Sequence, residues 1–585
     1  MELAPPAAPV APRRELTARA LAFGCVAGAL LSAGQVYVGL KTGFNDGGSI
    51  ATALVAFGFF AAVRRFSPAA FGPLENNIAQ TTAAAAAIMG FSAGLTSAFP
   101  ALTMMGHDYP QWALPVWGAA TGAIGVLVAS RLRQKLVRRE RLPFPTGAAT
   151  GEVIAAIGSA REVAMRRATL LVATAAFAMA FAWFRDGRPA LIPQLLPIDV
   201  VVAGTSLASL TVGLFPSPLM ISTGMLIGER AALSLLAGAV VGWVILAPRL
   251  VQAGVVAAPT YVACNAWLVW PGVGLLLAGS LVPLALDWRG VARGLRDVAV
   301  AMRRRAAAGE PPHTSDDLPR WAKAALAAAV AAVFALSIGV FHVGWLVALV
   351  GLALSVVLAN MCARTAGETD MAPVGSLAAV TQLALTGQGT MGSVVGGSVV
   401  LGAASQATQT LWAFKAGDRF DASPRAQLTA ELVGCVVGSL VAVPAYALIV
   451  RAYGIATVAL PAPAALSWRA TAEAVQHGFG ALPPHAPVAA LVAFGIGLVV
   501  IVLSRTRAAR YLPSPAAMGI AMLTPFSISM SAALGGLLLI VARRLSRSSD
   551  TEANIAAVAA GGIGGESIMA VIVAGLIATG LLVPR

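Results

Sequence analysis

Acidic residues inside apolar sequence are the first candidates for chemistry in this chain. Five glutamates lie in or beside long apolar runs: Glu75, Glu152, Glu229, Glu431 and Glu566. A carboxylate at the depth of the lipid hydrocarbon costs at least a few kcal/mol, so such residues are rare and usually functional. Burial also disfavours the charged form of a carboxyl group, which suits a group that takes up and releases protons. We therefore treat the five glutamates as candidate proton-binding or substrate-binding residues.

Glu152 ends an unusual stretch, 143–152, which reads Pro-Phe-Pro-Thr-Gly-Ala-Ala-Thr-Gly-Glu. Basic clusters at 131–141 and 161–167 flank it. Because short Lys/Arg-rich loops stay on the cytoplasmic side, both ends of the segment are expected on one face of the membrane. The apolar part is short for a full span, and proline and glycine interrupt it. The pattern predicts a discontinuous helix that dips into the bilayer and returns, carrying Glu152 to a translocation site.

Each glutamate also has a purely structural interpretation. Glu229 precedes Arg230 and could form a local ion pair or end a cytoplasmic helix. Glu75 follows Gly-Pro and could cap a helix start, where carboxylates are favoured. Glu152 and Glu431 could stand at ordinary helix N-termini, and Glu566, among four glycines, could hold helices together. The sequence leaves both interpretations open for all five.

Other polar residues near these glutamates complete the candidate set. Asn76, Asn77 and Gln80 follow Glu75 and could hydrogen-bond a peptide backbone or hold a break in a helix. Thr146 and Ser514, from two proline-containing motifs, are further candidates, and Tyr37 and Lys41 are weaker ones. For Lys41, the favoured interpretation is an exposed loop pair with Asp46.

Composition fixes the class of protein. The chain has 585 residues, of which 58% are hydrophobic and 11% charged, and its mean hydropathy is +0.81. Apolar runs of about 20 residues, the length of a membrane-spanning helix, recur along the chain. We therefore predict an all-α polytopic membrane protein. The net charge of +15 comes from Lys and Arg in short loops, which indicates positive-inside topology and no nucleic-acid partner.

Cysteine and histidine give no sign of a metal or redox centre. The four cysteines are isolated, and the five histidines have no ligand spacing. The chain also lacks the His-Glu-x-x-His and Gly-x-Ser-x-Gly motifs of common hydrolases. We expect no metal, no cofactor and no enzymatic activity, and we keep an intramembrane enzyme and a passive channel only as alternatives.

The order of the segments suggests two related halves. We expect a cytoplasmic N-terminal tail at 1–19, membrane halves at 20–288 and 324–585, and a polar cytoplasmic linker at 289–323. A span is expected at about 197–215. Pro-Ser-Pro at 216–218 recurs at 513–515, and Ser-x3-Gly at 234–238 recurs at 531–535, both 297 positions later. Paired, proline-broken segments in two halves are typical of a transporter's binding site.

A further match links two of the glutamates. The pattern Pro-x4-Thr-x-Glu ends at Glu152 in the first half and at Glu431 in the second. Each copy follows a basic loop, although the offset is 279 positions instead of 297. The two glutamates are thus predicted to occupy related places in the two halves.

In these motifs the chain resembles the oligopeptide transporter family. One branch of this family contains the yellow-stripe-like metal-chelate transporters. The matching segments run from end to end, and they are 37–43, 74–81, 143–152, 512–515, 525–527 and 564–567. The resemblance implies about sixteen transmembrane or re-entrant helices, and a proton gradient that drives uptake of small peptides or metal chelates. It also implies that the motif residues named above line the site.

The resemblance leaves the substrate open. The chain departs from the plant metal-chelate pattern around Glu152, which favours peptides or peptide-like solutes over siderophore-type complexes. The expected location is the cytoplasmic (inner) membrane, with the N-terminus inside and membrane lipid around the helices. A homo-oligomer is possible, and no cofactor beyond the proton gradient is expected.

Overall fold

A computed structural model describes residues 15–44, 52–53, 55–56, 59, 72–159, 161–286, 296, 319–370, 372–477, 482–546 and 549–583. Eleven helices within these ranges are long and apolar enough to cross a membrane. The described strands are four pairs of residues. The prediction of an all-α polytopic membrane protein is confirmed. Most of the predicted linker, and most of the N-terminal tail, lie outside the described residues.

The helices divide between the two predicted halves. In the first they are α1 (Ala18–Thr42), α3 (Pro73–Ala87), α4 (Met89–Ser92), α5 (Ala98–Met104), α6 (Ala113–Arg133), α7 (Pro145–Ser159), α8 (Arg161–Asp186), α9 (Pro218–Ala239), α10 (Ala247–Gln252) and α11 (Tyr261–Leu286). In the second they are α13 (Arg320–Gly339), α14 (Trp345–Thr369), α15 (Val374–Ala384), α16 (Gly389–Asp418), α17 (Pro424–Tyr453), α18 (Pro463–His477), α19 (Ala486–Leu503), α20 (Pro515–Leu523), α21 (Phe526–Leu545) and α22 (Ser549–Ala578).

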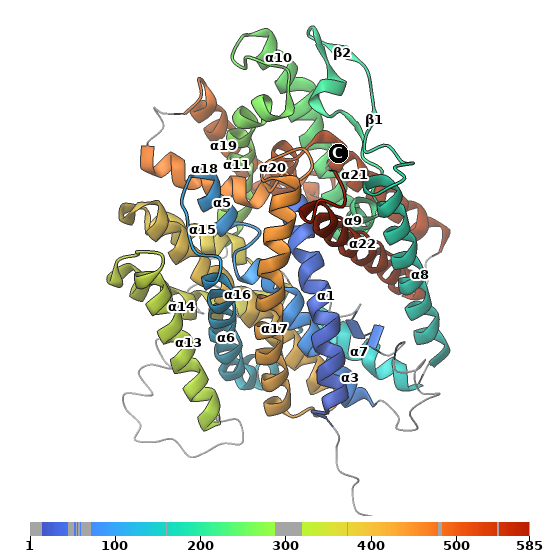
Figure 1. Cartoon of the computed structure of the whole chain (residues 1–585), viewed down its shortest axis with the longest axis vertical. Coiled ribbons are helices and arrows are strands. Elements are labelled where there is room, and N and C mark those ends of the chain that lie inside the picture. The colour runs from blue at the N-terminus through green and yellow to red at the C-terminus, as the bar shows by residue number, and fades with distance from the viewer. Residues whose placement is uncertain are drawn as a thin grey trace, which may run out of the picture.

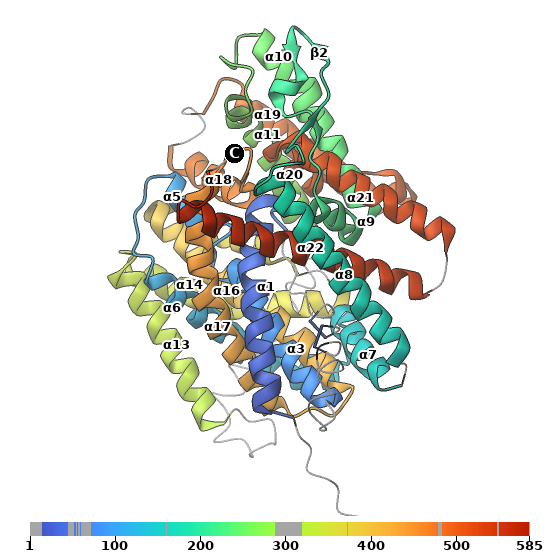
Figure 2. The same cartoon turned by 45° about the vertical axis from the view of Figure 1, so that its right-hand side comes forward.

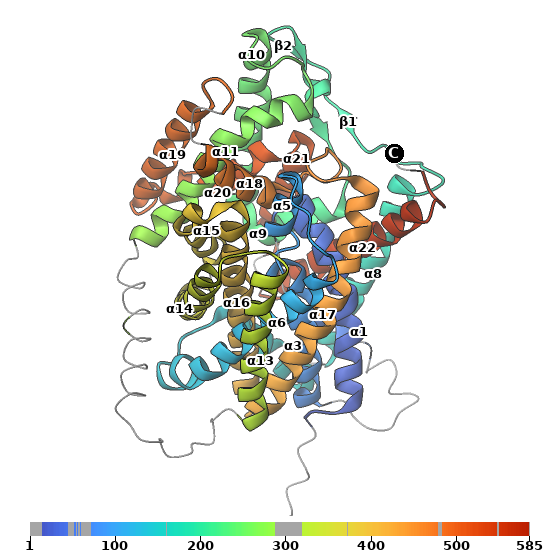
Figure 3. The ribbon, with the colours of Figure 1, turned by 60° about the vertical axis from the view of Figure 1, so that its left-hand side comes forward.

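The expected span at 197–215 is wrong. This stretch forms two small antiparallel ladders, in which β1 (Leu196–Pro197) pairs with β4 (Gly213–Leu214) and β2 (Val201–Val202) pairs with β3 (Thr205–Ser206). Prolines and a glycine in a left-handed conformation, Gly204, favour turns over a helix here. Together with α10, this region lies at the end of the molecule opposite to α3 and α13 (Figure 3).

Small residues bring α1, α3 and α17 into close contact (Figure 1). A Cβ atom on Gly434 of α17 would lie only 2.4 Å from the carbonyl oxygen of Thr82 in α3. Gly24 of α1 meets the same turn of α3, where a Cβ would lie 2.7 Å from the Thr82 side chain. Small residues allow this approach, as is common between membrane helices. Because α1 and α17 both approach α3 so closely, most side chains of α3 are buried.

Two broken helices pack against each other, and both breaks occur at the spacing of the sequence repeat. In α9 the helical geometry fails at Gly228, with φ 83° and ψ 161°. Pro525, 297 positions later, separates α20 from α21. Each segment starts at a serine whose hydroxyl accepts a backbone N–H of the first turn, Ser217 for α9 and Ser514 for α20. Such caps satisfy the free donors of a helix start.

The contacts between the two broken helices are reciprocal. A Cβ on Gly238 would lie 2.5 Å from the backbone of Met518, and one on Gly535 would lie 1.9 Å from the carbonyl oxygen of Ile221. Gly535 lies 297 positions after Gly238, and Ile221 lies 297 positions before Met518, so the second contact repeats the first with the two halves exchanged. The two elements therefore meet as related copies would meet across an approximate two-fold axis.

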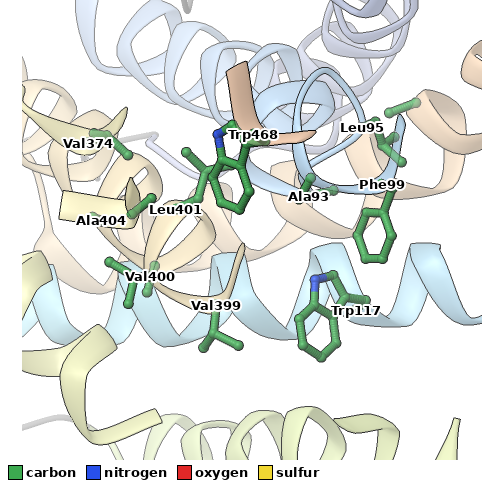
Figure 4. Close-up of a cluster of buried hydrophobic side chains, with 14 of the residues drawn as sticks. Ala93, Leu95, Phe99, Trp117, Val374, Val399, Val400, Leu401, Ala404 and Trp468 are labelled. Carbon is green, nitrogen blue, oxygen red and sulfur yellow. The ribbon is translucent and has the colours of Figure 1, made fainter. Parts of the chain in front are cut away.

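An aromatic cluster joins α5, α6 and the turn before α14, and Figure 4 shows two of its members, Phe99 and Trp117. The Trp117 and Phe341 ring centroids are 5.0 Å apart in an edge-to-face arrangement, and Phe99 lies 5.6 Å from Phe341. Such pairs contribute about 0.5–1.5 kcal/mol beyond burial. Trp468 of α18 lies against neighbouring apolar residues of α16 in the same view. This cluster holds α5 against α6 and the turn before α14.

Candidate functional site

A group of buried charges lies where α1, α8, α9 and α22 meet. Arg185, at the end of α8, is fully buried. Its Nη2 is 2.8 Å from Glu566 Oε1 and 2.6 Å from Asp186 Oδ2, and its Nη1 donates to the carbonyl of Pro216 at 2.8 Å. One guanidinium therefore pairs with two carboxylates, a use that its planar set of donors allows. Figure 2 shows α22 beside α8 and α1.

Glu566 of α22 is also fully buried, and its carboxylate has several donors. Besides Arg185, the Ser217 hydroxyl lies 2.8 and 2.9 Å from its two oxygens, and the backbone N–H of Leu219 donates at 2.8 Å. Leu219 belongs to the first turn of α9, where N–H groups are free and the helix dipole favours an anion. Glu566 thus ties α22 to α8 and α9, which matches the structural interpretation of this residue.

Lys41 is buried near the end of α1, so its predicted place in an exposed loop is wrong. Its Nζ donates to the carbonyl of Ala459 at 2.9 Å and lies 4.4 Å from the centroid of the Phe215 ring. The Arg185 guanidinium lies 4.5 Å from the same ring. No carboxylate of the described residues comes within the 4.0 Å of an ion pair to Lys41. Asp46 lies outside the described residues.

A cavity of about 190 Å³ opens beside these charges. We call it the Lys41 cavity. It is lined by charged, amide and aromatic side chains from α1, the end of α8, the 194–215 region, the end of α17 and the start of α21: Tyr37, Lys41, Asp186, Gln194, Leu195, Thr211, Phe215, Tyr453, Val458, Ala459, Ser527 and Ile528. Of the residues predicted from the sequence, it brings together Tyr37 and Lys41. The sequence analysis did not identify Arg185, Asp186 or Phe215 as site residues. Arg185 and Asp186 directly follow an apolar run, which is the pattern of a turn outside the membrane.

Glu431 is a buried glutamate that pairs with no cation of the described residues. It is fully buried in α17. Its Oε2 accepts from Gln406 Nε2 and from the Thr410 hydroxyl of α16, both at 3.2 Å, while Oε1 has no hydrogen-bond partner. No ion pair reaches it from the described part of the chain. Ionisation of Glu431 would leave a buried charge with only neutral neighbours, which is costly.

The predicted amide residues of α3 are buried too. Asn76 donates to the carbonyl of Ala53 at 3.2 Å. Both amide atoms of Asn77, the Oε1 of Gln80 and the Oε1 of Gln35 in α1 have no hydrogen-bond partner in the described protein. Buried polar atoms are nearly always satisfied by protein, water or ligand. This part of the helix bundle is therefore polar enough to hold water or a solute.

The remaining three glutamates are placed differently. Glu75 accepts from Arg19 Nε at 2.8 Å and from the Thr17 hydroxyl at 2.7 Å, and it also accepts from the backbone N–H of Gly72, the N-cap residue of α3, at 3.4 Å. Glu229 is exposed and pairs with Arg543. Glu152 is exposed on α7. The structure does not bring Glu152 and Glu431 into one site.

The segment that contains Glu152 is a continuous helix, α7, so the predicted break is wrong. Thr146 donates its backbone N–H and its hydroxyl to the two carboxylate oxygens of Asp370, at 3.0 and 2.7 Å. Phe144 is fully buried, and its backbone N–H donates to the carbonyl of Gly367. The prolines precede the helix instead of interrupting it, and the motif anchors α7 to the end of α14.

Comparison with known sequences decides the family. The profile of the OPT oligopeptide transporter proteins matches residues 15–577, almost the whole chain. The chain belongs to this family. A Haemophilus influenzae protein named as an oligopeptide transporter is 24% identical over 93% of this chain and 92% of its own length. Metal-nicotianamine transporter YSL2 of Arabidopsis thaliana is 22% identical over 95% of this chain and 92% of its own length.

Membership in the OPT family confirms the resemblance seen in the motifs. The protein is a multi-pass membrane protein of a family of transporters. Relatives named for oligopeptides and for metal-nicotianamine complexes both align over nearly the full chain. The rice iron-phytosiderophore transporter YSL15 does so as well, at 24% identity over 95% of this chain and 91% of its own length.

Proposed function

We propose that this protein is a secondary active transporter that uses a proton gradient to import small peptides or peptide-like solutes across the cytoplasmic membrane. The family and the names of its relatives support transport of a small solute. The lysine- and arginine-rich segments at 131–141 and 161–167 support a cytoplasmic N-terminus, because such loops stay inside.

The observation that carries the proton coupling is the contrast between the two fully buried glutamates. Glu566 faces a guanidinium, a hydroxyl and a backbone N–H, so a cation and two further donors lie next to its carboxyl group. Among the described residues, Glu431 accepts hydrogen bonds from an amide and a hydroxyl and pairs with no cation. A carboxyl group without a cation can be neutral in one state of the transport cycle and lose its proton in another, when water or a cation reaches it. Glu431 is therefore our proposed coupling residue.

The test is uptake into proteoliposomes that contain the purified protein. With an inward proton gradient, the wild type is expected to accumulate radiolabelled dialanine. Glu431→Gln mimics a permanently neutral carboxyl, so it should allow exchange of dialanine across the membrane without accumulation. The matched control is Glu152→Gln, because Glu152 has the same local motif but is exposed. Accumulation by Glu431→Gln at the wild-type level would refute the coupling role.

A second function, transport of metal chelates, is favoured by the relatives named for metal-nicotianamine and iron-phytosiderophore complexes. A chelated metal brings its own ligands, so such a substrate needs no metal-binding residues on the transporter. The discriminating measurement is uptake of radiolabelled iron with and without nicotianamine into the same proteoliposomes. Chelate-dependent iron uptake together with no dialanine uptake would favour this second function.

A further inference from the structure

We propose that the Lys41 cavity binds the transported solute and recognises both ends of a zwitterion, with Lys41 holding its carboxylate and Asp186 its ammonium group. This inference rests on the proposed function and names the site and the substrate chemistry. It follows from the distribution of charge around the cavity, from the size of the cavity, and from the segments that build it.

Among the described residues, Lys41 has no carboxylate partner of the kind that Arg185 has. Arg185 pairs with both Asp186 and Glu566, whereas the Lys41 ammonium has a carbonyl and an aromatic ring near it. An ammonium group has three donors, and one of them is used by Ala459. The ring attracts the cation without neutralising it. A solute carboxylate in the cavity would give Lys41 a direct ion-pair contact, which none of the described carboxylates makes.

Asp186 offers the opposite charge on the same cavity. Its oxygens accept from Arg185 and, at 3.3 Å, from Gln194 Nε2. Its side chain is 13% exposed, unlike that of Arg185. Since two carboxylate oxygens offer about four acceptor positions, Asp186 can receive a further N–H donor from a solute.

Charge balance selects a zwitterion over a simple anion. Lys41 and Arg185 carry two positive charges, and Asp186 and Glu566 carry two negative charges. The group is neutral as it stands. A bound anion would leave an uncompensated negative charge in a poorly hydrated place, whereas a zwitterion adds none. The same argument disfavours peptides with a blocked amino or carboxyl end.

The size and position of the cavity fit a small transported solute. About 190 Å³ is less than the roughly 300–1,000 Å³ of pockets for drug-sized ligands, so the bound part is one or two amino-acid residues. Tyr37 and Tyr453, with ring centroids 6.1 Å apart, supply an apolar wall. The lining comes from both halves of the sequence, with α1 and α8 from the first and α17 and α21 from the second. A transporter's solute site is expected at such a junction.

The test measures binding to the purified full-length protein in lipid nanodiscs by isothermal titration calorimetry. The probes are dialanine, dialanine amide and N-acetyl-dialanine. We expect the wild type to bind dialanine at least about tenfold more tightly than either blocked form, because each lacks one charge-assisted contact. Lys41→Gln keeps a donor for Ala459 but removes the charge. It should weaken dialanine about tenfold and should not weaken dialanine amide, whose ammonium group compensates the net negative charge that the substitution leaves.

Lys323→Gln is the matched control, since Lys323 is exposed on α13 and the substitution removes the same charge. The proposal is overturned if wild-type protein does not bind dialanine, if it binds the amide as tightly, or if Lys41→Gln binds dialanine like the control. Should Lys41→Gln fail to fold, the comparison of the three probes on the wild type decides alone. Binding of dialanine by this pattern without proton-driven accumulation would refute the proposed function and leave the site assignment intact.

Discussion

Replacement of Arg185 by methionine tests whether the buried charges hold the fold together. Methionine keeps much of the volume of the side chain and removes its charge and donors. Glu566 would keep the Ser217 hydroxyl and the Leu219 N–H but would lose its cation while fully buried. Asp186 would lose its main partner too, although the cavity gives it access to water.

The expected loss follows from the burial of the pair. Removal of one partner of a buried ion pair costs about 3–5 kcal/mol, because the other charge remains uncompensated. The chain contains a matched surface control in Arg543, which also pairs with two carboxylates, those of Glu229 and Glu552. Arg543 is 42% exposed, so Arg543→Met should cost no more than about 1 kcal/mol.

The assay is thermal unfolding of the purified variants in detergent, followed by tryptophan fluorescence. Arg185→Met should unfold at a clearly lower temperature than Arg543→Met. Adding Glu566→Gln to Arg185→Met should restore part of the loss, since the unpaired charge is then removed. Equal unfolding temperatures for the two arginine variants, or a double variant less stable than the sum of its parts, would show that the reasoning is wrong.

Two further predictions use the same assay. Gly434→Ala should destabilise by about 1–3 kcal/mol, because its methyl group would overlap a backbone carbonyl of α3. Gly575→Ala, with nothing within 4 Å of the added carbon, should leave stability unchanged or slightly raised, and equal losses for both would contradict the packing. Ser217→Ala should cost more than the roughly 1 kcal/mol of a lost helix cap, because Ser217 also donates to a buried carboxylate. Ser514→Ala, which removes a cap alone, is its control, and an equal loss would mean that the extra hydrogen bond contributes nothing.

The sequence predicted the helical class well, because span length and hydropathy are local properties. It also predicted paired, proline-broken segments with Ser-Pro at 217–218 and 514–515, because a serine cap and a proline act on their own backbone, but it did not place the breaks at Gly228 and Pro525. The expectation of a span at 197–215 failed for the converse reason. Apolar content alone does not make a helix where prolines recur and the chain can pair with itself as strands.

The candidate site was predicted only in part. Arg185 and Glu566 are far apart in the sequence, and nothing in either local pattern indicates that they meet. Glu152 and Glu431 show the limit most clearly. Both end the same Pro-x4-Thr-x-Glu pattern, yet one is exposed and the other fully buried. The difference comes from neighbouring helices, because α17 is covered by α1, α3 and α6 along much of its length.

The reciprocal contacts between α9 and α20–α21 have a consequence for biosynthesis. Ile221 and Gly238 of the first half are covered by residues of the second half, and Met518 and Gly535 are covered in return. A nascent polypeptide that has inserted only as far as α19 would still present this seam to lipid or to a chaperone. Neither half expressed by itself should reach a protease-resistant state. The two halves co-expressed as separate polypeptides should associate and become protease-resistant.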